Sequence, residues 1–132
     1  MARLIQAIQA FGSKLERQKT AQLEAVAEWM SMRTGLNKSE VMMVLQEQSE
    51  AILFFNKQGI PVKFPGVGTF SPSISRDGEY RVNFRTDVAL KKGINQTDAY
   101  TGNIINPGRI GLDDLGYKDL WDADHPEDPL EI

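Results

Sequence analysis

The chain has 132 residues, of which 41% are hydrophobic and none is cysteine, and its formal net charge is −3. This length suits one ordinary domain with an added segment, and the moderate hydrophobic content suits a small core or a core that two chains complete together. The composition excludes disulfides and thiolate metal sites, and no apolar run approaches the roughly 20 residues that cross a bilayer.

The charges are unevenly distributed along the chain. Residues 111–132 hold eight acidic residues and one basic residue, a net charge of −7, whereas residues 1–110 hold 14 basic and 10 acidic residues, a net charge of +4. A mildly basic body can attract a polyanion, and an acidic segment can mask that body. Residues 1–11 lack the apolar stretch of a secretory signal, so we expect a cytoplasmic protein without a membrane partner.

The N-terminal segment fits two local structures. Its apolar residues share a helical stripe (Leu4, Ile8, Phe11 and Leu15), but the alternation of Ile5 and Ala7 with glutamines fits a strand about as well. We expect a short strand at about residues 3–10, within an N-terminal extension that spans residues 1–18.

Two helices are predicted next. Thr20 is a suitable N-cap for a helix over residues 20–34, and Gly35 supplies its left-handed stop. Asn37 caps a second helix that runs to about Gln58. Apolar residues occupy far more than one face of this second helix, which is typical of a helix buried on more than one side and, in so small a domain, indicates a partner subunit.

Three short strands and a final helix follow. The strands are predicted at residues 61–64, 69–75 and 80–85, with an Asp77-Gly78 hairpin signal, and Thr86 is a suitable cap for a helix to about Asn95. Alternation divides the sheet into an apolar face and a polar face that has no acidic residue. The polar face is predicted to carry Lys63, Ser71, Ser73, Ser75, Arg81, Asn83 and Arg85.

The residue types of this polar face suit a phosphate backbone. Hydroxyl, amide and guanidinium groups donate hydrogen bonds to phosphate oxygens, and arginine can do so with two N–H groups. The pattern therefore indicates binding to nucleic-acid backbone rather than to a base sequence. A merely solvated face of an antiparallel sheet is the alternative.

The C-terminal extension spans residues 96–132. Gly, Asn, Thr and Pro predict a loop over residues 96–111, and the apolar residues of 111–121 predict a short helix. Residues 122–132 carry two prolines and many acids, and we expect an extended acidic tail.

No catalytic, metal or cofactor site is predicted. His125 is the single histidine, and the acids around it lack the spacing of a calcium loop. Gly66 and Gly68 suit a tight turn, because a strand rather than a helix follows them. Trp29 and Trp121 lie on helical patterns and are interpreted as packing residues. We therefore expect a protein that is not an enzyme and has no small-molecule substrate.

Three motifs, in order, resemble the bacterial histone-like HU and integration host factor family. They are Gly35-Leu36-Asn37-Lys38-Ser39-Glu40, Gly66-Val67-Gly68-Thr69-Phe70 and Phe84-Arg85-Thr86-Asp87-Val88-Ala89-Leu90-Lys91. The resemblance covers residues 19–95 and implies an α+β fold with a two-helix base, a three-stranded antiparallel sheet and a short final helix. The extensions on both sides are similar to those of a divergent HU-like branch.

The resemblance also implies a function and a partner. It implies an intertwined homodimer that binds double-stranded DNA in the bacterial nucleoid, with an interface that includes Met42, Met43, Leu45, Ile52, Phe54 and Phe55. DNA contacts are expected from Lys63, Ser71, Ser73, Arg81, Asn83 and Arg85, with Arg76 and Lys91 as secondary contacts.

One departure from the family matters for the function. Only residues 75–79 join the last two strands, and no proline lies at their tip, so long arms that wrap and kink DNA are not expected. The missing arms, the negative net charge and the acidic tail support a rival hypothesis. It is a structural or protein-interaction module of the same fold that has lost DNA binding, in which the tail masks the basic saddle formed by the two sheets of the dimer.

Overall fold

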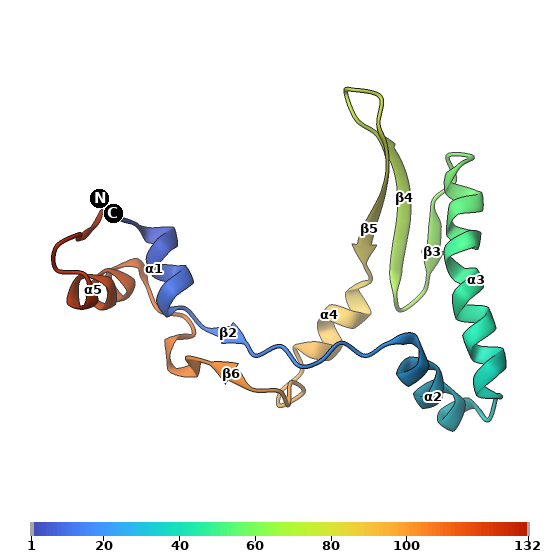
Figure 1. The fold of residues 1–132 in the computed structure, drawn as a ribbon, viewed down its shortest axis with the longest axis horizontal. Helices are drawn as coiled ribbons and strands as arrows, with labels where there is room; N and C mark the ends of the chain where they lie inside the picture. The colour runs from blue at the N-terminus through green and yellow to red at the C-terminus, as the bar shows by residue number, and fades with distance from the viewer. Residues whose placement is uncertain (1, 132) are drawn as a thin grey trace. The chain divides into compact units, whose positions relative to one another are not determined.

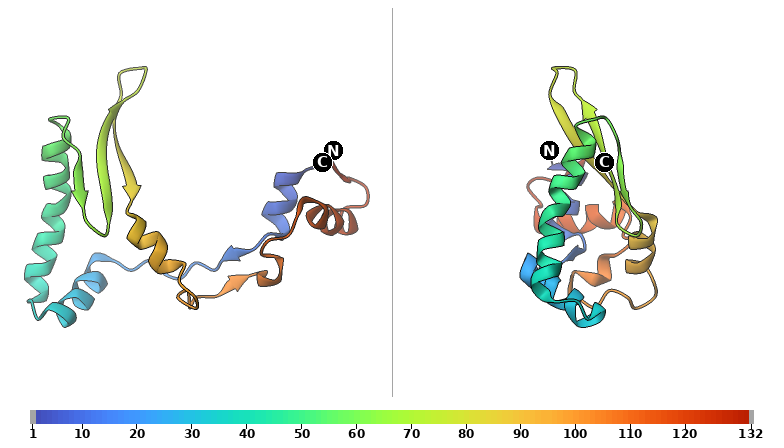
Figure 2. Two further views of the ribbon diagram at one scale, coloured as in Figure 1. Left: turned by 180° about the vertical axis from the view of Figure 1, so that it is seen from behind. Right: turned by 90° about the vertical axis from the view of Figure 1, so that its right-hand side faces the viewer.

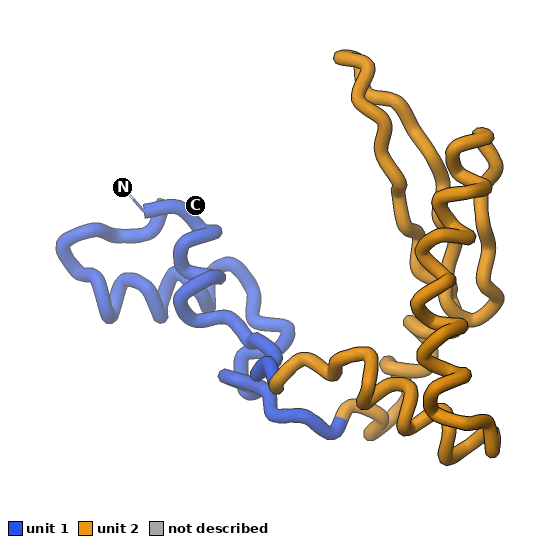
Figure 3. Tube along the Cα trace, turned by 45° about the vertical axis from the view of Figure 1, so that its right-hand side comes forward, with its two compact units in different colours: residues 1–18, 101–132 blue, residues 19–100 orange. Residues whose placement is uncertain are grey.

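The computed structural model describes residues 2–131 and divides into two compact units (Figure 3). Residues 19–100 form one unit, here called the central unit. Residues 1–18 and 101–132 together form the other, the terminal unit. Among residues 2–131, no helix combines the length and apolar content that crossing a membrane requires.

The central unit begins with the two predicted helices. They are α2 (Leu23–Thr34) and α3 (Lys38–Asn56). Gly35 ends α2 in the left-handed conformation at φ 75°, and the Asn37 side chain accepts a hydrogen bond from the Ser39 N–H at 2.9 Å, as a capping residue does. The start of the first helix was predicted wrongly, because Gln22 rather than Thr20 is its N-cap residue.

The predicted sheet is also present. Strands β3 (Val62–Phe64), β4 (Gly68–Ile74) and β5 (Tyr80–Thr86) form an antiparallel sheet in the order β3-β4-β5, and α4 (Val88–Ile94) follows. Asp87 rather than Thr86 caps α4, because its carboxylate accepts the Ala89 N–H at 2.8 Å. Figures 1 and 2 show α3 running alongside the sheet, so the unit is a mixed helix-and-sheet fold.

The apolar face of the sheet is organised by aromatic rings. Phe70 lies between Phe64 and Phe84, with ring centroids 6.1 Å and 4.6 Å away. The buried Asn56 at the end of α3 donates its side-chain N–H groups to the carbonyl of Ile60 at 3.1 Å and to that of Phe70 at 3.3 Å. These hydrogen bonds join the helix end to the sheet.

The terminal unit is assembled from segments that are far apart in the sequence. From the N-terminal side come β1 (Ala2–Arg3), α1 (Leu4–Phe11) and β2 (Lys14–Leu15). From the C-terminal side come β6 (Ile104–Ile105), a 3₁₀ turn (Pro107–Arg109), α5 (Asp114–Asp124) and β7 (Leu130–Glu131). β1 pairs in parallel with β7, and β2 pairs antiparallel with β6.

The prediction of a strand at about residues 3–10 was wrong. Residues 4–11 form α1, because the helical stripe finds a partner in α5. Ala7 is completely buried, and the Phe11 ring meets the Trp121 ring edge-on at 6.4 Å between centroids. This packing confirms the interpretation of Trp121 as a packing residue.

The prediction of an extended acidic tail was also wrong. α5 continues to Asp124, and the residues after it fold back so that Leu130 is 3% exposed in the core with Trp121. His125 ends the helix and stacks on Trp121, with ring centroids 3.9 Å apart. The indole N–H donates to the carbonyl of Asp128 at 2.7 Å, which holds the returning segment.

Candidate nucleic-acid interface

The register of the sheet arranges its polar side chains in three rows across the strands. Lys63 pairs with Thr69, which pairs with Arg85, to form the first row. The pairs Ser71–Asn83 and Ser73–Arg81 form the other two rows. Because paired residues point to the same face of a sheet and alternate residues share it, these side chains form one surface. We call it the polar face: Lys63, Thr69, Ser71, Ser73, Arg81, Asn83 and Arg85.

Thr69 is a member of this face that the sequence interpretation missed. It lies between Lys63 and Arg85 in the first row, where its hydroxyl adds a hydrogen-bond donor. Thr69 lies two residues before Ser71 in β4, and this spacing indicated that the two side chains share a face of the sheet.

Ser75 lies just after β4 and differs from the two serines within that strand. Its N–H donates to the carbonyl of Glu79 at 2.8 Å, and its hydroxyl accepts the Glu79 N–H at 3.0 Å. The residue therefore closes the hairpin, and it lies beyond the last pair of the β4–β5 register, Ile74 with Tyr80, outside the three rows.

One side-chain hydrogen bond orders the polar face. The Asn83 side-chain N–H donates to the Ser73 hydroxyl oxygen at 2.7 Å, diagonally across β4 and β5. Ser73 thereby keeps its own O–H proton free to donate outward. The three basic side chains of the face, Lys63, Arg81 and Arg85, belong to exposed residues.

An acidic residue lies near one end of the polar face, and it affects Lys63. The Asp87 carboxylate accepts the N–H of Ala89 and that of Gly66, at 2.8 Å and 3.3 Å. These hydrogen bonds and the charge of Lys63 hold the pKa of Asp87 below its ordinary value. Because Asp87 stays ionised, it offsets part of the Lys63 charge, and Arg81 and Arg85 carry most of the positive potential.

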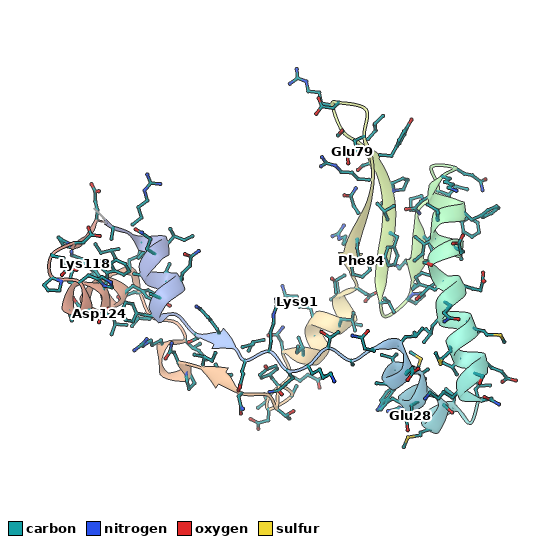
Figure 4. The ribbon with its side chains drawn as sticks, in the orientation of Figure 1. Glu28, Glu79, Phe84, Lys91, Lys118 and Asp124 are labelled. Carbon is teal, nitrogen blue, oxygen red and sulfur yellow. The ribbon has the colours of Figure 1, made fainter. Side chains whose placement is uncertain are left out.

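The two secondary residues lie away from the rows. Arg76 is in the turn between Ser75 and Glu79. Lys91 lies in the last turn of α4, outside the sheet (Figure 4). The structure therefore gathers Lys63, Ser71, Ser73, Arg81, Asn83 and Arg85 on one surface and leaves Arg76 and Lys91 apart from it.

The other face of β5 is apolar and uncovered within the chain. Tyr80, Val82 and Phe84 alternate with the polar residues, and they are 82%, 51% and 48% exposed. The aromatic rings of the sheet lie on this side, so the polar face carries donors and charges but no ring on which a base could stack.

The residues predicted to form a subunit interface lie along α3. Met43, Phe54 and Phe55 are exposed, whereas Met42, Leu45 and Ile52 are half-buried. Trp29, interpreted as a packing residue, is 58% exposed on α2, where the Arg33 guanidinium lies 4.7 Å from its ring centroid.

Comparison with known proteins finds a likeness among solved structures. No protein-family model matches the chain, and no curated protein matches it either. Among solved structures, the chain is similar to an HU mutant from Thermotoga maritima, with 19% sequence identity and a TM-score of 0.48. That match covers 57% of this chain and 100% of the other.

Proposed function

We propose that this protein is a non-enzymatic homodimer that binds the backbone of double-stranded DNA through the polar face, with little sequence preference. The observation that carries the proposal is the set of three rows in which hydroxyl, amide and cationic side chains alternate without an acid. The biological setting that fits this function is the bacterial nucleoid, in the cytoplasm.

The chemistry of the polar face favours backbone over bases. Phosphate contacts come from arginine, lysine, serine, threonine and asparagine side chains, the types that fill the three rows. Single-strand binders instead use aromatic platforms for stacking, and the rings of this sheet lie on its opposite face. Binding would then proceed by phosphate neutralisation, release of counterions and recognition of duplex shape.

Few cationic groups are available, and this limits the affinity. Arg81 and Arg85 lie four residues apart on β5, about 14 Å at 3.4 Å per residue, so they can reach different phosphates. With so few contacts per protomer, the dissociation constant is expected on the order of micromolar or weaker at physiological salt. The short hairpin has no proline at its tip, so strong kinking of the duplex is not expected.

Dimerisation is proposed because the central unit lacks a closed core in a single chain. Of residues 19–100, only Ala27, Val41, Asn56 and Gly68 are buried. Large apolar side chains stay exposed on α3, with Val44 at 69% and Phe54 at 61%, and on β5, with Tyr80 at 82%. So much uncovered apolar surface is typical of a protein–protein interface. A second copy is the occupant that the resemblance of the sequence implies.

The DNA proposal is tested by fluorescence anisotropy with a labelled duplex of about 30 base pairs. Reversal of the two central charges, by Arg81→Glu with Arg85→Glu, is expected to abolish binding at low salt. The matched control, Lys19→Glu with Lys38→Glu, changes the net charge equally but lies outside the polar face, and it should bind nearly as well as the unchanged chain. No binding of the unchanged chain at low salt would contradict the proposal and favour the rival protein-interaction module.

A single substitution on α3 tests the dimer. Phe54→Glu places a charge on the proposed interface and should yield a monomer in sedimentation velocity at tens of micromolar. Met32→Glu is the control, because Met32 is 80% exposed on α2 and outside the predicted interface. If the unchanged chain sediments as a monomer, the dimeric part of the proposal is wrong.

The masking role of the acidic residues has its own test. Asp119→Asn with Glu127→Gln removes two charges from exposed residues of the terminal unit. If the acids mask the polar face, this variant should bind DNA more tightly than the unchanged chain. Equal affinity of the variant and the unchanged chain would show that these two acidic residues do not mask the polar face.

A further inference from the structure

The terminal unit contains a two-stranded antiparallel ribbon whose side chains stay exposed. β2 and β6 form it, with Lys14 paired to Ile105 and Leu15 paired to Ile104 (Figure 1). Leu15, Ile104 and Ile105 are 56%, 36% and 47% exposed. A two-stranded ribbon is marginally stable in water, and three or more strands with an apolar face are needed for independent stability. The ribbon is therefore suited to the addition of a further strand.

The backbone of Leu15 faces the open edge of β2. The Glu16 N–H donates to the Asn103 carbonyl at 3.0 Å, so the backbone of residue 16 is directed toward the β6 side. Successive residues of an antiparallel strand alternate in this respect, and the N–H and C=O of Leu15 therefore point away from β6. An added strand would find one hydrogen-bond donor and one acceptor at this residue, as in binding by β-strand addition.

The three residues along this edge are complementary to themselves. Lys14, Leu15 and Glu16 are all exposed, and they place a positive and a negative charge on either side of an apolar residue. If two copies of β2 lie antiparallel with Leu15 opposite Leu15, each Lys14 lies opposite the Glu16 of the other copy. The two Leu15 residues then exchange both backbone hydrogen bonds. The flanking Lys–Glu pairs are of the non-hydrogen-bonded type, in which the Cα atoms are about 4.5 Å apart and the side chains are closest.

The same arrangement extends the apolar side of the ribbon. Leu15 and Ile104 are cross-strand partners, so their side chains lie on one face. In a four-stranded sheet of order β6-β2-β2-β6, the two Leu15 and the two Ile104 side chains form one continuous apolar row. Such a sheet has the number of strands that the isolated ribbon lacks.

The other edge of the ribbon is less suited to self-pairing. On β6 the alternation directs the N–H and C=O of Ile104 outward. Antiparallel pairing about Ile104 would place Asn103 opposite Ile105, a polar side chain against an apolar one, and would join no charges. Asn106 follows in the left-handed conformation at φ 55°, and a 3₁₀ turn begins after it, so the strand ends there. Charge and backbone geometry both favour the β2 edge.

We propose that β2 pairs with β2 of a second copy of this chain, antiparallel and centred on Leu15, so that two terminal units share one four-stranded sheet. This contact is separate from the dimer of central units proposed above and depends neither on that dimer nor on DNA binding. Two different two-fold contacts on one chain join dimers into larger assemblies. Because the contact spans few residues, it belongs to the small, transient interfaces and needs a higher protein concentration than the dimer.

Single charge reversals test the register of this contact. Lys14→Glu places Glu opposite Glu in both flanking pairs, and Glu16→Lys places Lys opposite Lys. Each variant alone is expected to weaken self-association about tenfold. An equimolar mixture of the two variants should associate about as well as the unchanged chain, because each flanking pair then joins Glu to Lys. Sedimentation velocity of the full-length chains, from tens to hundreds of micromolar, measures the mass.

A control and the possible outcomes separate this contact from the proposed dimer. Lys19→Glu changes the net charge as Lys14→Glu does but lies outside β2, and it should associate like the unchanged chain. A mass that does not rise with concentration would overturn the β2 contact, and so would a rise that neither reversal weakens or that the mixture fails to restore. A chain that is monomeric at tens of micromolar and associates above that range, with sensitivity to Lys14→Glu, would contradict the dimer of central units and support the β2 contact.

Proline substitutions on the two edges provide an independent test. Leu15→Pro removes the outward N–H of β2 and keeps the hydrogen bonds to β6, since proline is tolerated where the N–H of an edge strand faces solvent. It should abolish the association. Ile104→Pro removes the corresponding N–H of β6 and should have a smaller effect, whereas the reverse order of effects would overturn the assignment to β2. Fluorescence of Trp121, which lies in the core of the terminal unit, shows in a Trp29→Phe background that both variants stay folded.

Discussion

Ala2 pairs with Leu130 in a short parallel ladder, and the two residues are only 2% and 3% exposed. Lys118 and Asp122 of α5 hold this ladder in place. The Lys118 ammonium donates to the Leu130 carbonyl at 2.9 Å, and the Asp122 carboxylate accepts the Leu130 N–H at 2.8 Å. Leu130 thus joins the N-terminal and C-terminal segments of the terminal unit, through its backbone hydrogen bonds and its buried side chain.

The first prediction concerns Leu130 itself. Leu130→Ala should lower the free energy of unfolding of the terminal unit by about 2–5 kcal/mol, because it leaves a cavity beside Trp121. Urea unfolding followed by Trp121 fluorescence, in a Trp29→Phe background, measures the change. Leu115→Ala is the control, because Leu115 is 65% exposed and its truncation should change stability by less than about 0.5 kcal/mol. Equal effects of the two substitutions would contradict the role of Leu130.

The terminal unit should also lose stability in acid, through Asp122. The hydrogen bond from Lys118 at 2.8 Å and that from the Leu130 N–H hold the pKa of Asp122 below its ordinary value. A carboxylate whose pKa is lower in the folded state stabilises that state above the unfolded pKa of about 3.9, and the stabilisation disappears as the pH falls through the folded pKa.

Unfolding of the Trp29→Phe variant at pH 6 and at pH 3 measures this effect. Asp122→Asn should reduce the loss of stability between the two pH values, because the titrating group is gone. Asp119→Asn, on an exposed residue of the same helix, should leave the loss unchanged. An identical acid response of Asp122→Asn and the unchanged chain would show that other groups govern it.

The central unit was more predictable from the sequence than the terminal unit, for physical reasons. The two-residue alternation from Thr69 to Arg85 determines which side chains share a face once the strands pair locally through a five-residue turn. The pairing of Ala2 with Leu130 spans nearly the whole chain, and neither segment has a pattern that indicates its partner. Over the eight residues of α1, helical and strand periodicity were both satisfied, and the packing of Ala7 and Phe11 on α5 decided between them.

Gly66 and Gly68, the two glycines in the turn between β3 and β4, make a matched pair for the next prediction. A Cβ on Gly68 would lie 2.6 Å from the Phe84 ring and would also collide with the Arg85 carbonyl. A Cβ on Gly66 would meet no atom within 4 Å, although φ there is +83°. Gly68→Ala should therefore displace β5 from β4 at the first row of the polar face.

Thermal unfolding and DNA anisotropy together test this difference. Gly66→Ala should cost about 1–2 kcal/mol through its left-handed backbone and leave DNA affinity nearly unchanged, provided the protein stays folded. Gly68→Ala should cost about 1–3 kcal/mol through overpacking and should also weaken DNA binding, because Arg85 and Thr69 lose their register. Unchanged DNA affinity in folded Gly68→Ala would show that the first row does not contribute.

The last prediction concerns the salt dependence of DNA binding, which counts the phosphates that the polar face neutralises. The logarithm of the binding constant falls with the logarithm of salt concentration with a slope of about −0.9 for each phosphate neutralised. If Arg81 and Arg85 each neutralise one phosphate in both copies, Arg81→Ala with Arg85→Ala should make the slope less steep by about 3.6. Lys63→Ala should change it less, because Asp87 already offsets part of the Lys63 charge.

Anisotropy titrations at salt concentrations from about 25 to about 200 mM give the slopes. Arg81→Lys with Arg85→Lys keeps the charges and should keep the slope, even if the loss of bidentate geometry lowers the affinity. If the alanine variant keeps the slope of the unchanged chain, the cationic contacts to DNA lie elsewhere than on the polar face.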